Sequence, residues 1–221
     1  MSLPSIFGFR FVISFCILSP GEDVIPGDLG QPVMSTASHP QLLTLEELDA
    51  LPGGQDRDLI RGQIRERVMT RRNRLYCRIE SQLVMFLGIW LKSQPAPRGQ
   101  IVSGEAGFRL RRDPDTGVGI DVAYISAELA AHEPSSPYFE GPPILAVEIL
   151  SPSDKQEEID EKIELYLACG VQVVWIVNPR LETVMVFRPD VPPSLFSASQ
   201  VLEAEPHLPG FRLALSEVFR A

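Results

Sequence analysis

The chain has 221 residues, of which 44% are hydrophobic and 22% are charged. This fits one large globular domain and excludes a mostly disordered chain and a protein with several membrane spans. A formal net charge of -9 argues against a protein that coats nucleic acid along its whole surface. The cysteines and histidines are few and scattered, which gives no support to a disulfide scaffold or zinc site and favours a reducing, cytoplasmic location.

The first 38 residues are predicted to be a flexible, disordered extension. Residues 6–18 are apolar, but Gly8 and Arg10 interrupt them, and the longest unbroken run is too short to cross a bilayer. The segment also lacks the preceding positive charge and the cleavage site of a secretory signal. We therefore expect no membrane association, an extension over 1–38 and a single folded domain over 39–221.

The first half of the folded part predicts helices and strands in alternation. A capping box formed by Thr44 and Glu47 begins the first helix, and apolar residues three and four apart mark the second. Alternation of apolar and polar residues marks the strands. The predicted elements are a helix over 45–50, a hairpin or bent strand pair over 58–69, a helix over 74–92, and strands over 100–110 and 117–126.

Two almost wholly apolar runs in the second half predict strands that are buried on both faces. Between them lies a helix that we expect Ser153 to cap and Gly170 to end. Strand, helix and strand in this order form a crossover unit, which predicts an α/β sheet with some parallel pairing. The predicted elements are a strand over 144–150, a helix over 155–168, a strand over 171–177 and an alternating strand over 182–188.

Positive charge is concentrated between residues 57 and 78, which hold eight arginines and only two acidic residues. The planar guanidinium group of arginine matches phosphate geometry. A solvated surface and a phosphate-facing patch explain this concentration equally well. If the patch faces phosphate, the predicted nucleic-acid contacts are Arg65, Arg67, Arg71, Arg72 and Arg74.

Two acidic residues stand in strands that are otherwise apolar. Glu148 interrupts the run over 144–150, and Asp121 interrupts the strand over 117–126. A buried carboxylate is costly unless it is paired or bound to a cation. If the two strands are neighbours, the carboxylates converge into a minimal site for Mg²⁺, with Mn²⁺ as an alternative. The competing interpretation is a structural ion pair for each acid.

Lys162 lies at the margin of the apolar face of the helix over 155–168. A lysine there either extends to solvent or reaches over the sheet toward Glu148. Beside a metal-bound acid pair, it could hold the attacking water or stabilise negative charge on a phosphoryl oxygen.

The order of Asp121, the segment 148–154 and Lys162 resembles the Uma-two family of restriction-endonuclease-like proteins, within the PD-(D/E)XK nuclease superfamily. The resemblance runs from about residue 43 to the end of the chain. The blocks that carry it are GEAGFRL (104–110), IDVAYIS (120–126), YFEGPPILAVEILSPSD (138–154), EKIELYLACGVQVVWIVNP (161–179), TVMVFRP (183–189) and HLPGFRL (207–213).

The resemblance implies a restriction-endonuclease-like mixed central β-sheet flanked by α-helices, and Mg²⁺-dependent hydrolysis of DNA. By position, Asp121 and Glu148 match the metal-binding acids, and we expect the backbone carbonyl of Ile149 to join them. Leu150 occupies the position of the superfamily's motif lysine, and Lys162 matches the lysine that this family carries on the following helix.

The leading hypothesis is thus a metal-dependent endonuclease, with Asp121, Glu148 and Lys162 as catalytic residues. A nuclease fold that has lost catalysis and acts as a nucleic-acid-binding or interaction module is the alternative, favoured by the net charge and by Leu150. We also expect a homodimer, for which an exposed edge strand over 182–188 is one candidate interface.

Overall fold

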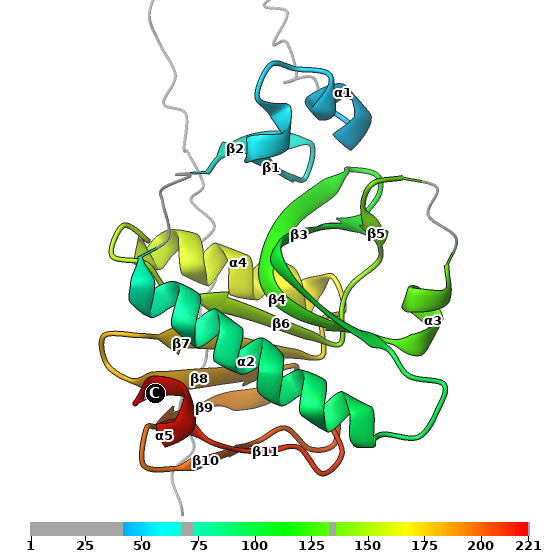
Figure 1. Ribbon diagram of the computed structural model, residues 1–221. Coiled ribbons are helices and arrows are strands. Elements are labelled where there is room, and N and C mark those ends of the chain that lie inside the picture. Colours follow the sequence, from blue (N-terminus) through cyan, green and yellow to red (C-terminus); the bar gives the residue numbers. More distant parts are fainter. Residues whose placement is uncertain (1–41, 68–72, 133–135, 221) are drawn as a thin grey trace, which may run out of the picture. The chain divides into compact units, whose positions relative to one another are not determined.

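The computed structural model describes residues 42–67, 73–132 and 136–220 (Figure 1). The chain divides into two units, residues 1–38 and 39–221, and every described residue belongs to the second. The predicted extension over 1–38 lies outside the described residues. Within them, no helix is both long and apolar enough to span a bilayer.

The elements of the first half follow the sequence pattern. The predicted capping box is confirmed, because the Thr44 hydroxyl accepts from the Glu47 amide and the Glu47 carboxylate accepts from the Thr44 amide. Asn73, which the sequence did not single out, caps the long helix. The elements are α1 (Leu45–Asp49), a 3-10 turn (Gly54–Asp56), β1 (Arg57–Ile60), β2 (Gln63–Glu66), α2 (Arg74–Ser93), β3 (Gln100–Arg111) and β4 (Thr116–Ile125).

The second half contains the predicted crossover unit and several short elements that the sequence pattern did not predict. A helix and a two-residue strand lie between the predicted strands over 117–126 and 144–150, where no element was predicted, and three strands and a helix follow the last predicted strand. The elements are α3 (Ala127–Ala131), β5 (Phe139–Glu140), β6 (Leu145–Ile149), α4 (Gln156–Ala168), β7 (Val173–Asn178), β8 (Thr183–Arg188), β9 (Val191–Ser197), β10 (Val201–Glu203), β11 (Arg212–Ala214) and α5 (Leu215–Phe219).

The main sheet runs in the order β2-β1-β4-β6-β7-β8-β9, with β3 paired to β4 and to β5. The pairs β6–β7 and β3–β5 are parallel and the others are antiparallel. The crossover from β6 through α4 to β7 produces the central parallel pair. The predicted mixed sheet flanked by helices is therefore confirmed.

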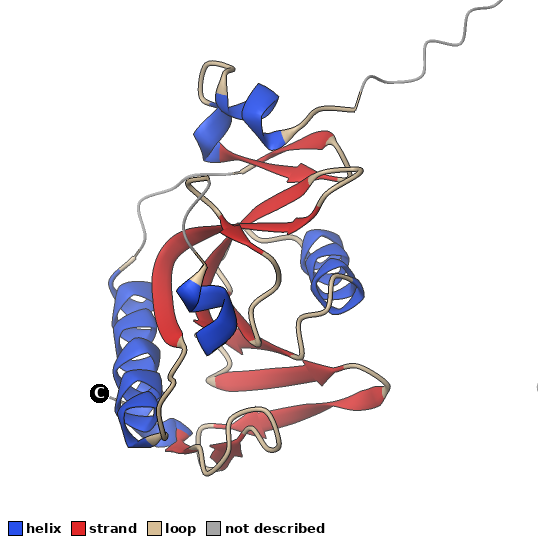
Figure 2. Ribbon diagram, turned by 90° about the vertical axis from the view of Figure 1, so that its right-hand side faces the viewer, coloured by secondary structure: helices blue, strands red, loops and turns tan. Residues whose placement is uncertain are grey.

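Helices cover both faces of the sheet, α2 on one and α4 on the other (Figure 2). Alternation along each strand decides which face a side chain joins. Val147 and Trp175 pack in the core beneath α2, which also receives α5. Ala146 and Val174 belong to the core beneath α4. Glu148 follows Ala146 by two residues, so it points to the α4 face.

Two expectations are corrected here. The strand over 182–188 is not an edge, because β8 pairs with β7 on one side and with β9 on the other. Ser153 does not cap α4, because the N-cap is Lys155, and the Ser153 hydroxyl instead bonds the hydroxyl of Ser151 at 2.9 Å. The residues before α4 thus form a turn in which the serine hydroxyls bond each other and not the start of the helix.

Candidate active site

The two acidic residues of the apolar strands lie side by side. β4 and β6 are antiparallel neighbours, and the pair Val122–Val147 places Asp121 beside Glu148 at the end of the ladder. The Ile149 amide donates to Oδ2 of Asp121 at 2.8 Å, which fixes that carboxylate against β6. The Asp121 residue is 4% exposed and the Glu148 side chain 13%. The two strands are thus neighbours, which is the condition on which convergence of the two carboxylates depends.

Two residues of α4 bind the Glu148 carboxylate. Nζ of Lys162 donates to Oε2 at 3.0 Å, and the Tyr166 hydroxyl donates to Oε1 at 2.6 Å. These donors are four residues apart, so they lie one above the other on the same helical face. The crossover connection brings this face over the sheet directly after β6. Lys162 therefore reaches Glu148, which was one of its two predicted outcomes.

Burial and charge shift the proton affinities at this site. Burial raises the pKa of the Glu148 carboxyl, and Lys162 opposes the shift while Asp121 adds to it. Burial lowers the pKa of Lys162, but the carboxylates of Glu148 and Asp58 outweigh it and hold that pKa above its ordinary value. Burial and Glu148 hold the pKa of Tyr166 well above its usual range. Lys162 is thus a cation, and Tyr166 a neutral donor, at neutral pH.

The sequence did not single out Asp58, a third carboxylate of this region. It lies on β1, is 4% exposed, and accepts from the Gly119 amide of β4 at 3.1 Å. Burial raises its pKa to about 6. The charge of Lys162 acts to lower this pKa, and the charge of Glu148 acts to raise it. Its signal in the sequence was weak, because an acid in a short alternating hairpin is expected to face solvent.

The donor set suits a hard cation that retains water. Within the described ranges, no three His, Cys, Asp or Glu residues are grouped so that they could hold a metal ion. Asp121 and Glu148 supply carboxylate oxygens, the ligand type that Mg²⁺ prefers, and Mg²⁺ usually keeps several waters. The backbone of Ile149 is in direct contact with Asp121, because the Ile149 amide donates to the Asp121 carboxylate. These three residues could therefore hold one ion whose remaining positions are water or phosphate oxygens.

The structure describes three of the five predicted nucleic-acid arginines, and their surroundings differ. The Arg65 side chain is 44% exposed and pairs with Glu161 at 3.4 Å. Arg67 is enclosed in ion pairs with Asp58 and Glu105. Arg74 is exposed at the start of α2. Arg71 and Arg72 lie outside the described residues, so a phosphate-binding role for this group stays a prediction.

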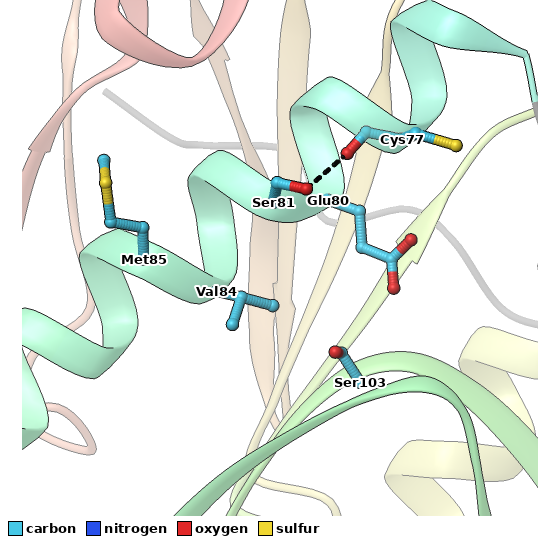
Figure 3. Close-up of a pocket in the computed structure, with 6 residues that line it drawn as sticks. All are labelled: Cys77, Glu80, Ser81, Val84, Met85 and Ser103. Carbon is cyan, nitrogen blue, oxygen red and sulfur yellow. Dashed lines mark hydrogen bonds between the residues drawn. The ribbon is translucent and has the colours of Figure 1, made fainter.

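A separate hollow lies between α2 and β3 (Figure 3). Glu80 points from the helix toward β3, where its carboxylate accepts from the Gly104 amide at 3.1 Å. The hollow contains none of the predicted site residues. Its lining residues are Cys77, Glu80, Ser81, Val84, Met85 and Ser103.

Comparison with known proteins identifies the family and the fold of the chain. Residues 45–216 match the Uma2 family, whose description is "Putative restriction endonuclease". The chain belongs to the Uma2 family. No curated protein matches it significantly. A crystal structure from Anabaena variabilis, described as "a putative nuclease belonging to DUF820", has the same fold, with a TM-score of 0.67 and 22% identity over 80% of this chain and 98% of that one.

Proposed function

We propose that this Uma2 protein is a metal-dependent endonuclease that hydrolyses phosphodiester bonds of DNA. One observation carries the proposal: Glu148 stands beside Asp121 on neighbouring strands and is bound by Lys162 from the next helix. Two buried acids and a lysine are suited to binding a cation and an anionic phosphate together. Membership of a family whose description is "Putative restriction endonuclease" supports the same function.

Each residue has a separate task in this proposal. A Mg²⁺ or Mn²⁺ ion held by Asp121, Glu148 and the carbonyl of Ile149 would lower the pKa of a bound water and neutralise the scissile phosphate. Lys162 is held as a cation, so it donates hydrogen bonds to the attacking water or to a charged phosphoryl oxygen. Tyr166 fixes the rotamer of Glu148 through its 2.6 Å hydrogen bond.

Cleavage of supercoiled plasmid, single-stranded DNA and RNA, with and without Mg²⁺ or Mn²⁺, tests the proposal. We expect metal-dependent nicking of DNA that Asp121→Asn and Glu148→Gln reduce by at least about a hundredfold, since each removes a ligand charge. Glu164→Gln is the matched control, because Glu164 is exposed on the same helix. Equal cleavage by all variants would reject the site.

A nuclease fold that binds nucleic acid without cutting it is the second candidate. Leu150 cannot act as the motif lysine, and both Glu148 oxygens already accept hydrogen bonds from the chain. The cleavage assay separates the two candidates when it is combined with a gel mobility shift. A protein that only binds nucleic acid should shift DNA but give no cleavage products at any metal concentration. For either function, Arg65 and Arg74 would contact backbone phosphates, as would Arg71 and Arg72 outside the described residues.

The proposal also includes a cytoplasmic homodimer. The interface expected at β8 is covered by β9, whose Pro192 and Pro193 lack the amide donors that strand pairing requires. A dimer would then use another surface. Light scattering after size exclusion should give twice the mass of one chain, and the mass of a single chain would contradict this part.

A further inference from the structure

The solvent side of α2 carries exposed apolar side chains instead of charged ones. Met85 is 46% exposed and Ile89 is 59% exposed, and they are four residues apart, so they lie one above the other on the same helical face. Between Glu80 and Lys92 the helix has no charged residue. The outward face of a helix that covers a core is usually charged or polar. An exposed apolar patch is, in contrast, typical of a contact surface.

Gly88 lies on the same side of the helix, three residues after Met85. A glycine in the interior of a helix destabilises the helix relative to alanine. A Cβ added at Gly88 would meet no atom of the described residues within 4 Å, so packing within this part of the chain does not require the glycine. A glycine on an outward helical face does allow another helix to approach closely. Gly88 is thus explained by a partner that packs against α2.

The exposed row of this face, here called the α2 row, consists of Cys77, Ser81, Met85 and Ile89, which are four residues apart. The first two side chains are small and the last two are large. The Ser81 hydroxyl donates to the Cys77 carbonyl at 2.8 Å, so a partner can cover it without breaking a hydrogen bond. Cys77 and Ser81 line the hollow between α2 and β3, and Met85, which also lines it, points away from β3 (Figure 3). The α2 row therefore has a recessed end and a protruding end.

A row with a recessed end and a protruding end fits an inverted copy of itself. Helices that cross at about 50° bring their rows of residues four apart into line with each other. A two-fold axis, the commonest symmetry of protein dimers, inverts one row relative to the other. With the axis between Ser81 and Met85, Ile89 of each copy faces the other copy's Cys77, and Met85 faces the other copy's Ser81. Every large side chain then meets a small one.

We propose that α2 pairs with the α2 helix of a second copy in antiparallel orientation, through the α2 row. The inference rests on the homodimer of the proposed function and names its surface. Charge favours a second copy here, because two chains of net charge -9 repel each other and can meet most easily where the surface is uncharged. The crossing angle separates the helix ends, which keeps the exposed Arg74 and Lys92 in solvent. α4 and the candidate active site lie on the other face of the sheet, so this pairing leaves them uncovered (Figure 2).

Cysteine cross-linking tests the register, in a chain whose Cys16 and Cys169 are replaced by serine so that Cys77 is the one natural thiol. The thiol of Ile89→Cys should face the other copy's Cys77, so mild oxidation should give a covalent dimer on a non-reducing gel. Without Ile89→Cys there should be no link, because the two Cys77 residues would lie roughly 18 Å apart along the helices. Adding Cys77→Ser to Ile89→Cys should abolish the link. Leu195→Cys, at an exposed leucine of β9, is the matched control and should not form one.

Light scattering after size exclusion tests whether this face holds the dimer together. We expect a dimer for the wild type and for Leu195→Lys, and a monomer for Ile89→Lys, which would place a charge against the other copy's Cys77. A dimeric Ile89→Lys, a monomeric Leu195→Lys, or no link in Ile89→Cys would overturn the inference but not the homodimer. A monomeric wild type would overturn both and leave the α2 row to a different partner. Circular dichroism shows that each variant is folded, and cleavage activity enters neither test, so failure of the proposed nuclease function is a separate result.

Discussion

Tyr166 and Glu148 form a buried contact whose strength can be measured. The Tyr166 side chain is fully buried, and its hydroxyl donates to a carboxylate. Tyr166→Phe removes a hydrogen bond to a charged group and should lower the free energy of unfolding by about 1–3 kcal/mol. In the proposed mechanism Tyr166 orients Glu148 without contacting substrate, so the substitution should also lower kcat while KM changes little.

Urea denaturation and cleavage kinetics measure these two effects. Tyr138→Phe is the control, because the Tyr138 hydroxyl donates to Asp49 of α1 and not to a candidate site residue. Its kcat should equal that of the wild type. A Tyr166→Phe protein with unchanged stability and unchanged kcat would show that this hydrogen bond does not support Glu148.

Asp58 predicts a specific pH dependence of stability. Its pKa is raised to about 6 in the folded chain from an ordinary value of 3.8. The folded state therefore holds this proton more tightly, so its stabilising contribution is complete below the unfolded pKa and is lost as pH rises through 6. Between pH 5 and 7 the wild type should lose roughly 1 kcal/mol that Asp58→Asn does not lose.

Chemical denaturation of metal-free wild type and Asp58→Asn at both pH values tests this sign. Asn retains an acceptor for the Gly119 amide, so the comparison isolates the titrating charge. A wild type that gains stability relative to Asp58→Asn toward pH 7 would contradict the assigned pKa.

The candidate site could be predicted from the sequence only where a polar residue broke an apolar pattern. Asp121 and Glu148 stood out because their strands are otherwise apolar, and Lys162 because of its place on an amphipathic helix. Asp58 and Glu105 could not be found this way. Asp58 lies in a short alternating hairpin, where an acid is expected to face solvent. A backbone bulge rather than a residue pattern determines where Glu105 points.

At the scale of elements, one buried arginine joins α1 to the sheet. The Arg109 side chain on β3 is 1% exposed and forms ion pairs with Glu46 of α1, Glu140 of β5, and Asp115. The Asp115 carboxylate also accepts from the Leu45 amide at 3.0 Å, so it fixes the start of α1. Removing one partner from such a cluster leaves the others as uncompensated charges.

Arg109→Met should therefore destabilise the protein by about 3 kcal/mol or more, and deuterium exchange should increase in α1. Arg112→Met is the matched control, since the Arg112 side chain is 58% exposed and shares the partner Glu140. Its cost should stay below about 1 kcal/mol. Equal destabilisation by both variants would mean that burial of Arg109 adds nothing to the strength of the ion pairs that join α1 to the sheet.

The elements could be predicted where apolar residues recur at regular spacing over a long segment. α2 and the β6–α4–β7 unit follow directly from apolar spacing. β9 could not be predicted, because its sequence VPPSLFS contains two prolines, which normally exclude strand pairing. Its position at the end of the sheet order explains how it is accommodated, because an edge strand pairs along one side only.

At the scale of the whole molecule, a net charge of -9 is unfavourable for binding a polyanion. The acids of the candidate site contribute to this charge, so a bound divalent ion both offsets part of it and relieves repulsion between neighbouring carboxylates. Metal binding should for this reason stabilise the folded protein, in addition to supporting the proposed cleavage reaction. The two effects depend on the same residues, so stability reports on the site even without a known substrate.

Mg²⁺ or Mn²⁺ at about a hundred times its dissociation constant should raise the free energy of unfolding by about 2.7 kcal/mol and Tm by roughly 5–10 °C. Glu148→Gln should show almost no rise, because it removes the carboxylate charge that the ion would meet, whereas Glu164→Gln on the exposed face of α4 should keep the full rise. Thermal unfolding with Ca²⁺ as a further oxygen-binding ion completes the series. An equal rise of Tm in the wild type, Glu148→Gln and Glu164→Gln would place the ion elsewhere on the acidic surface. Only an ion bound at Glu148 should be lost in Glu148→Gln and kept in Glu164→Gln.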